Sequence, residues 1–210
     1  SCDIYASFLQ KDGSWSEAVN LGPKINSVMW ESQPSISSDG KTLYFVRGRS
    51  GNSQNIDIYY STLDDQGRFS EAQPIKGKVN TPGQEQSPYI HFDNQHLYFS
   101  SNGHPGMGGQ DFFVSERQPD GSWGEPKNLG YPINTPKEEF SLIVAPDGKT
   151  GYFSSDGLSD NIGSTDLYSF TLPEESQARQ IAYIEGVVSN QKTKEKLDAH
   201  LIFSRLDSNT

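Results

Sequence analysis

The chain has 210 residues and carries 27 acidic against 17 basic side chains, a formal net charge of −10. Such acidity disfavours nucleic acid and anionic membrane surfaces as partners, and no apolar run approaches the ~20 residues that a membrane-spanning helix needs. Aromatic residues make up 11% of the chain, and 20 glycines and 12 prolines supply turns. This composition predicts an all-β fold built from short strands.

A repeat of about 54 residues runs through most of the chain. The acidic residue that begins an Asp-Ile-Tyr-like triplet recurs at Asp3, Asp57, Asp111 and Asp166, at intervals of 54, 54 and 55 residues. Several motifs kept at one offset are the signature of a repeat architecture. Three other motifs follow the same spacing: Asp-Gly-Ser-Trp or its variant at 12–15, 66–69 and 120–123; Asn-Ser/Thr at 26–27, 80–81 and 134–135; and Asp-Gly-Lys-Thr or its variant at 39–42, 93–96 and 147–150.

Each repeat predicts four antiparallel strands. In the repeat that starts at Glu85, we expect strands at 86–92, 96–101, 111–117 and 123–129, with a glycine-rich loop between the second and third strands. Four strands per repeat, arranged radially, form the blade of a β-propeller. A cylindrical solenoid is the lesser alternative, because its coils are usually shorter than this repeat.

In chain order, the sequence opens at a third strand and continues with two full blades, roughly 31–80 and 85–134. The last repeat starts at Glu139 and ends after its third strand near Leu172. Residues 1–172 are therefore expected to form about three repeats of a propeller. Closed propellers have typically 4–8 blades, so we expect a longer polypeptide, or blades from another chain, to complete the ring. The first option is favoured, because a free-standing arc would leave sheet edges exposed.

The pattern changes after the last repeat. Residues 173–180 predict a linker, and residues 181–210 predict the start of a β-sandwich domain, with a strand at 183–188, a charged turn at 191–196 and a second strand at 197–201. The lone cysteine, Cys2, is in register with Ile56, Gln110 and Thr165. This register predicts a strand residue rather than an acylated lipoprotein terminus.

Two strings carry a family resemblance. Residues 37–45 and 145–155, each followed by an Asp-Ile-Tyr-like strand, resemble the WD-like propeller repeats of TolB-type proteins. The long form, with Asp-Gly-Ser-Trp, Asn-Leu-Gly and Ile-Asn-Thr-Pro, resembles the propellers of OmpA-family lipoproteins of Bacteroidetes, among them PorE-type members associated with type IX secretion. Residues 185–188 with 196–199 are similar to the opening hairpin of a carboxypeptidase-regulatory-like domain.

The resemblance implies a periplasmic location in association with the outer membrane. It also implies a non-catalytic protein-interaction scaffold whose partners are envelope proteins, linked to type IX secretion or to attachment of the outer membrane to peptidoglycan. Two alternatives stay open, a glycan- or peptidoglycan-binding module and an accessory domain of a secreted hydrolase. The residues themselves predict no catalytic site, no cofactor and no metal site, because no convergent carboxylates, nucleophile motif or zinc-ligand spacing is present.

The recurring side chains favour structural roles. Trp15, Phe69 and Trp123 share one repeat position, which predicts packing of blade against blade. The recurring aspartates are expected to accept hydrogen bonds from the loop that precedes each of them. Asp156, Asp160, Asn161 and Asp166 are dense enough to consider Ca²⁺, but they lack the EF-hand spacing, so a solvated loop is favoured.

One end of the propeller is predicted to bind partners. Strands alternate in direction, so the loops at 47–55, 101–110 and 155–165 share an end with the turns between blades. These loops differ from blade to blade, and variable loops on a regular scaffold commonly carry binding. The candidate partner-binding residues there are Arg47, Arg49, His104, Met107 and Asp160. Ordinary surface variation is an equally good explanation of their divergence.

Overall fold

The computed structural model describes residues 2–49, 55–155, 162, 166–182 and 186–199. Within them, thirteen strands and one short 3₁₀ helix make an all-β fold of antiparallel sheets. The N-terminal hairpin pairs β1 (Tyr5–Ala6) with β2 (Val19–Asn20). The prediction of an all-β propeller-type fold is confirmed.

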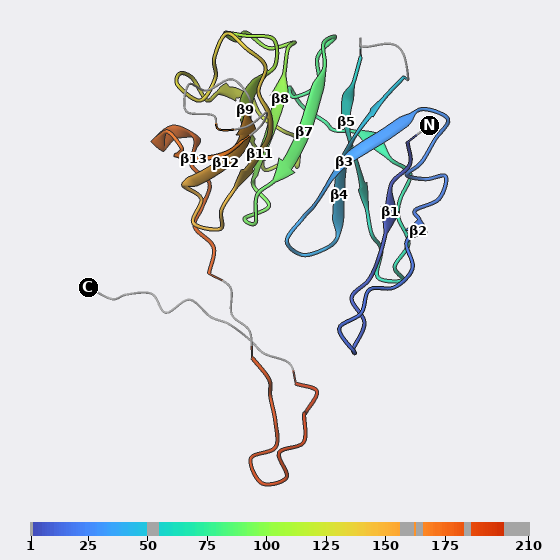
Figure 1. Ribbon diagram of the computed structural model, residues 1–210. Helices are drawn as coiled ribbons and strands as arrows, with labels where there is room; N and C mark the ends of the chain where they lie inside the picture. Colours follow the sequence, from blue (N-terminus) through green and yellow to red (C-terminus); the bar gives the residue numbers. More distant parts are fainter. Residues whose placement is uncertain (1, 50–54, 156–161, 163–165, 183–185, 200–210) are drawn as a thin grey trace, which may run out of the picture.

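Two complete blades follow the hairpin, each a four-stranded sheet in sequential order. Blade A contains β3 (Trp30–Ile36), β4 (Thr42–Gly48), β5 (Asp57–Thr62) and β6 (Gln73–Pro74). Blade B contains β7 (Glu85–Ile90), β8 (His96–Ser101), β9 (Asp111–Glu116) and β10 (Lys127–Asn128). Blade C is the three-stranded sheet of β11 (Phe140–Val144), β12 (Thr150–Ser155) and β13 (Asp166–Thr171). Figure 1 shows the three sheets side by side.

The fourth strand of blade B is shorter than the sequence predicts. Residues 123–129 were expected to be extended, but the paired strand is only Lys127–Asn128. Trp123 instead forms isolated bridges, antiparallel to Arg117 and parallel to Gly77. Gly77 has a φ of +116°, and a Cβ on it would lie 2.0 Å from the Trp123 carbonyl oxygen. The backbone at Trp123 therefore lies directly against Gly77, in the connection between blades A and B, instead of continuing the edge strand of blade B.

Apolar side chains fill the layers between sheets. Tyr44 and Val46 of β4 pack toward blade B with Leu97 and Phe99, whereas their neighbours on β4 pack toward the N-terminal hairpin. Because successive side chains of a strand point to opposite faces, the continuous apolar run of β4 buries both of its faces. Tyr98, on the opposite face of β8, packs toward blade C. The second strand of each full blade is thus held between two neighbours.

The first strands share a bulge that the sequence did not indicate. Gln33, Ser87 and Ser141 have positive φ values of 51°, 49° and 62°, and each lies within a register shift. The Gln33 side chain accepts a hydrogen bond from the Ser87 backbone at 2.7 Å, and the Ser35 hydroxyl accepts one from the Ile90 backbone at 3.0 Å. The bulge therefore positions polar groups that join the first strand of one blade to that of the next.

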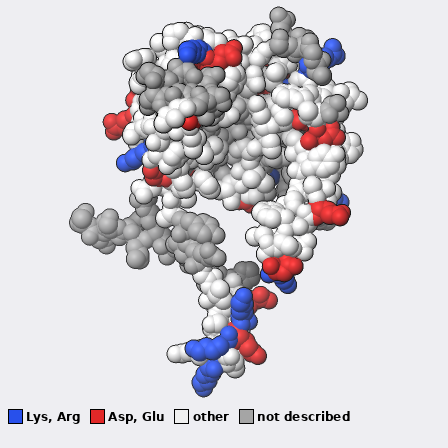
Figure 2. All heavy atoms as spheres, viewed as in Figure 1, with Lys and Arg blue, Asp and Glu red and all other residues white. Residues whose placement is uncertain are grey.

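The segment after β13 packs against the blades before it leaves them. A 3₁₀ helix covers Glu174–Ser176, and Ala178, which is buried, donates its backbone N–H to Gly148. The described part of the following segment, 186–199, runs well away from the sheets and carries lysines at 192, 194 and 196 (Figures 1 and 2). It contains one antiparallel bridge, between Ser189 and Lys196. Residues 183–185 and 200–210, which include parts of both predicted strands and His200, lie outside the described residues.

Candidate functional site: the loop end of the blades

The loop end comprises the connections at 49–55, 102–110 and 156–165 together with the blade-to-blade turns at 21–29, 75–84 and 129–139. The opposite end, called here the Asp-Gly end, comprises the turns at 37–41, 91–95 and 145–149 and the hairpin tips at 10–14, 64–68 and 118–122. Figure 1 shows the two ends on opposite sides of the sheets. The antiparallel pairing of β4 with β5 and of β8 with β9 requires this separation.

Recurring asparagines hold the loop end to the third strands. Asn134, fully buried, accepts the Phe112 backbone N–H at 2.7 Å and donates to the Phe112 carbonyl at 2.9 Å. Asn26 makes the same two contacts with Ile4, and Asn80 makes them with Ile58. The side chain thus replaces the backbone of a neighbouring strand, and the residue 22 positions earlier in the chain is its partner each time. The sequence indicated a turn role but not this contact.

Recurring glutamates tie the blade-to-blade turn to the first strand. Glu85 accepts hydrogen bonds from the Thr81 hydroxyl at 2.6 Å and the Ser101 hydroxyl at 2.8 Å. Glu139 accepts one from Thr135 at 2.6 Å. Burial raises the pKa of both carboxyls despite these hydrogen bonds. Except for Glu139 Oε2, which is buried without a hydrogen-bond partner, their oxygens accept hydrogen bonds from the chain itself, which indicates a structural role.

The predicted role of the recurring aspartates is confirmed where the structure describes their loops. The Asp111 carboxylate accepts the backbone N–H groups of Met107 at 2.7 Å and Gly108 at 3.2 Å. Asp166 accepts the backbone N–H of Ile162 at 2.6 Å. These carboxylates order the loop between the second and third strands, as Asp commonly does for local backbone.

Two of the predicted partner-binding residues are engaged in internal contacts. The Arg47 guanidinium donates to the buried Glu31 carboxylate at 2.8 Å and lies 4.5 Å from the Tyr59 ring centroid. His104 contacts the Val79 carbonyl at 2.8 Å through its Nε2 atom, and its ring packs on Phe113. Both side chains diverge from the repeat, yet both fasten loop-end connections to the sheets.

Two other predicted residues are open to solvent, and one is not described. Met107 is 50% exposed, and Arg49 is exposed directly after β4. Asp160 lies outside the described residues, as do Asp156 and Asn161 of the calcium hypothesis. Within the described ranges, no group of three His, Cys, Asp or Glu side chains is arranged to hold a metal ion.

The structure adds exposed apolar side chains that the sequence reasoning missed. Val28 is 100% exposed, Tyr131 77% and Ile162 95%. All three belong to loop-end connections, as does Met107. For Val28 and Tyr131, the signal that could have identified them is an apolar residue beside a recurring asparagine turn, where repeat symmetry assigns no core position.

Recurring aromatics at the Asp-Gly end have unequal environments. Trp123 is 3% exposed and packs edge-on against Tyr44 of blade A, with ring centroids 6.0 Å apart. Phe69 is partly buried against the cluster of the N-terminal hairpin. Trp15 is 67% exposed, because no described sheet lies on its side of the hairpin. The predicted packing between blades is therefore observed for Trp123 and Phe69 and not for Trp15.

Comparisons with known proteins agree with the fold. No family model and no curated protein matches the chain. The solved TolB of Acinetobacter baumannii is similar in structure, with a TM-score of 0.52 and 15% identity over 81% of this chain and 35% of that one. A protein from Agrobacterium tumefaciens described as a candidate TolB gives a TM-score of 0.49 and 15% identity over 83% of this chain and 58% of that one.

The similarity to the Acinetobacter protein shows a TolB-like β-propeller fold. The chain spans about a third of the length of the Acinetobacter protein and somewhat more than half of the Agrobacterium one. Nothing in these comparisons matches the chain to OmpA-family lipoproteins or to a carboxypeptidase-regulatory-like domain. No helix in the described part of the chain is long and apolar enough to cross a membrane.

Proposed function

We propose that this chain is part of a β-propeller that serves as a non-catalytic protein-interaction scaffold of the bacterial cell envelope. The observation that carries the proposal is the contrast between the interior and the rim of the loop end. Inside, most of the recurring carboxylates and amides that the structure describes hydrogen-bond to the chain itself, although one buried oxygen of Asp111 and one of Glu139 have no partner. At the rim, apolar side chains such as Val28 and Tyr131 stand in solvent. Exposed apolar groups on a rigid frame favour a protein partner.

The envelope location rests on the resemblance of the repeats to TolB-type and OmpA-family propellers and on the TolB-like fold. A link to type IX secretion, association with the outer membrane, and attachment to peptidoglycan belong to the same proposal. The division into propeller blades at 1–172, a linker at 173–180 and a β-sandwich start at 181–210 is also proposed. Residues 176–178 would then fasten the linker to blades B and C, since Tyr98 donates to the Ser176 carbonyl at 2.7 Å.

The ring is proposed to be completed by further blades of the same repeat. Trp123 is covered by the preceding blade, whereas its repeat equivalent Trp15 is exposed together with Phe8 and Leu9, at 64% and 63%. A blade placed against the N-terminal hairpin as blade A lies against blade B would cover this apolar face. Such a blade would also remove an exposed sheet edge.

Site-directed photo-crosslinking tests the interaction surface. A photoreactive phenylalanine analogue at Val28, Met107 or Tyr131 is expected to form adducts with envelope proteins in living cells. The matched controls carry the analogue at Lys41 or Gln66, which are exposed positions of the Asp-Gly end. Adducts from the control positions alone would refute the proposed loop-end surface. Saturable heat of binding with muropeptides but no protein adduct would instead favour the peptidoglycan-binding alternative.

A further inference from the structure

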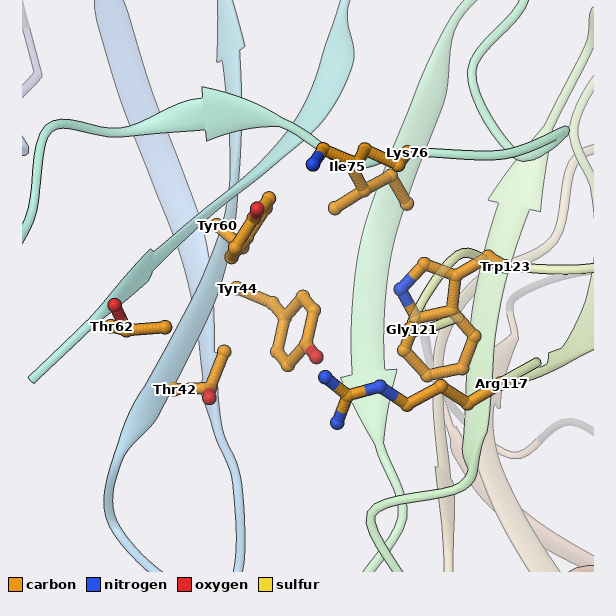
Figure 3. Close-up of a pocket in the computed structure, with 9 residues that line it drawn as sticks. All are labelled: Thr42, Tyr44, Tyr60, Thr62, Ile75, Lys76, Arg117, Gly121 and Trp123. Atoms are coloured by element: carbon orange, nitrogen blue, oxygen red, sulfur yellow. The ribbon is translucent and has the colours of Figure 1, made fainter. Parts of the chain in front are cut away.

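A small hollow opens between blades A and B at the Asp-Gly end, on the side of the molecule opposite the proposed partner surface. Tyr44, Tyr60, Arg117 and Trp123 are among its lining residues, and its volume is about 60 Å³. Figure 3 shows the Tyr44 hydroxyl and the Arg117 guanidinium turned toward one another across it. The hollow thus combines aromatic walls with a hydroxyl group and a cationic group.

The Tyr44 hydroxyl differs from that of its repeat equivalent. Both tyrosines are buried, at 3% exposure for Tyr44 and 0% for Tyr98. The Tyr98 hydroxyl donates to the Ser176 carbonyl at 2.7 Å, whereas the Tyr44 hydroxyl has no hydrogen-bond partner among the residues that the structure describes. Tyr44 lines the hollow, so an acceptor that enters the hollow can bind its hydroxyl. The chain thus supplies an acceptor at one of the two repeat positions and leaves the hydroxyl at the other open to a different acceptor.

An acceptor that enters the hollow would meet two cationic side chains. Arg117 and Lys76 line the hollow, and neither forms an ion pair within the described part of this acidic chain. Burial raises the pKa of Tyr44, so its hydroxyl is a protonated donor at neutral pH. The corresponding hollow on blade B is lined by three glutamates and one lysine, so acidic side chains predominate there.

The size of the hollow limits what it can hold. Drug-sized ligands occupy pockets of about 300–1,000 Å³, whereas this one has room for a few water molecules or for one terminal group. Arginine presents a planar set of donors that matches a carboxylate. Trp123 and Tyr60 offer apolar surface to the methylene groups that precede such a carboxylate.

We propose that the hollow between blades A and B binds a carboxylate group of a protein segment, with Arg117 and Tyr44 as its hydrogen-bond donors. The Tyr44 hydroxyl donates to one carboxylate oxygen and the Arg117 guanidinium binds the same group as a charged donor. Lys76 adds long-range attraction. This second site would let the propeller hold an acidic side chain or a chain terminus at the end remote from the loop-end surface.

NMR titration of the isotope-labelled 210-residue chain tests the proposal, with the Trp123 indole N–H as the reporter. The probes are N-acetyl-Ala-Glu-Ala-amide, which offers an acidic side chain, and N-acetyl-Ala-Ala-Ala, which offers a terminal carboxylate. Either peptide is expected to bind with a dissociation constant on the order of 1 mM. N-acetyl-Ala-Gln-Ala-amide, which lacks the charge, is expected to shift nothing, and so is inorganic phosphate at equal concentration.

Variants identify the donors. Arg117→Gln is expected to weaken binding about tenfold or more and Tyr44→Phe about three- to tenfold, in line with charged and neutral hydrogen bonds. Arg68→Gln is the matched control, because Arg68 is an exposed arginine of a neighbouring hairpin and is paired with Asp64; it is expected to leave binding unchanged. Binding of phosphate alone, equal binding of the Gln peptide, or full affinity in both Arg117→Gln and Tyr44→Phe would overturn the proposal. A negative result in this titration would not affect the crosslinks expected from the loop end, which test the proposed function separately.

Discussion

Replacing the recurring tryptophans one at a time tests how the blades are held together. Trp123→Ala removes an indole that is 3% exposed and packed against Tyr44 and the blade A cluster. Trp15→Ala removes the same side chain from the same repeat position, but there it is 67% exposed. The pair therefore separates burial between blades from any intrinsic property of the Asp-Gly-Ser-Trp hairpin.

The expected magnitudes follow from burial. A buried aromatic side chain removes about 200 Å² from water, which at about 25 cal/mol per Å² corresponds to an upper limit of about 5 kcal/mol. Truncation of large buried aromatics typically costs about 3–5 kcal/mol, and we expect Trp123→Ala to lie in that range. Trp15 keeps about a third of that burial, so Trp15→Ala is expected to cost about 1–2 kcal/mol.

Urea unfolding of the 210-residue chain, followed by far-ultraviolet circular dichroism, measures both free energies of unfolding. The free energy of unfolding should depend on urea concentration with a similar slope in the two variants, so that a difference in their urea midpoints reports a difference in stability. Equal losses in the two variants would show that the hairpin, and not the contact between blades, determines the cost. An unchanged midpoint for Trp123→Ala would refute the packing of blade B against blade A.

Four further substitutions probe the loop end and the Asp-Gly end by urea unfolding. Arg47→Met is expected to lower the free energy of unfolding by about 3–5 kcal/mol, because it leaves the buried Glu31 carboxylate without its cation. Adding Glu31→Gln to this variant should recover part of the lost stability. No recovery would show that the two side chains are not coupled. Asn134→Ala is expected to cost about 2–4 kcal/mol, since both backbone groups of Phe112 lose their partner, and a loss below about 0.5 kcal/mol would contradict this role. Burial acts to raise the pKa of Asp93, but hydrogen bonds from two histidines and from backbone amides lower this pKa below its ordinary value. The contribution of the Asp93 carboxylate to the free energy of unfolding is therefore fully present above about pH 4, where an unfolded aspartate titrates. This contribution is lost as the pH falls below that value. The stability gap between the wild type and Asp93→Asn should accordingly narrow from pH 7 to pH 3, and a gap that widens would reverse the assigned sign.

The sequence was sufficient for the repeat, the strand order and the structural role of the recurring aspartates. Asp111, for example, follows a glycine-rich loop, and a short acceptor in that place bonds the local backbone whatever the tertiary contacts are. The fourth strand was overestimated, because Pro126 and the close approach of Trp123 to Gly77 leave only two residues for pairing. An extended edge strand depends on its neighbour, which local pattern does not encode.

The candidate site was less accessible to sequence reasoning. Arg47 and His104 diverge from the repeat and so resembled recognition residues, but the fold places a buried glutamate beside the first and a backbone carbonyl beside the second. The exposed Val28 and Tyr131 are marked only by their positions beside a recurring asparagine. Whether a side chain at a loop end is used internally depends on partners that are distant in sequence, and these partners are set by packing.

Tyr44 and Tyr98 show the difference between what the sequence determines and what the tertiary structure determines. The sequence by itself determined that both residues occupy one repeat position on a buried second strand, because the 54-residue period and the alternation of the strand fix the face of each side chain. Only the tertiary structure decided that Ser176 satisfies one hydroxyl and that the other faces a cationic hollow. The reason is physical: periodicity specifies the face that is buried, whereas a hydrogen bond requires a particular atom within about 3 Å, and chain segments outside the repeat supply that atom.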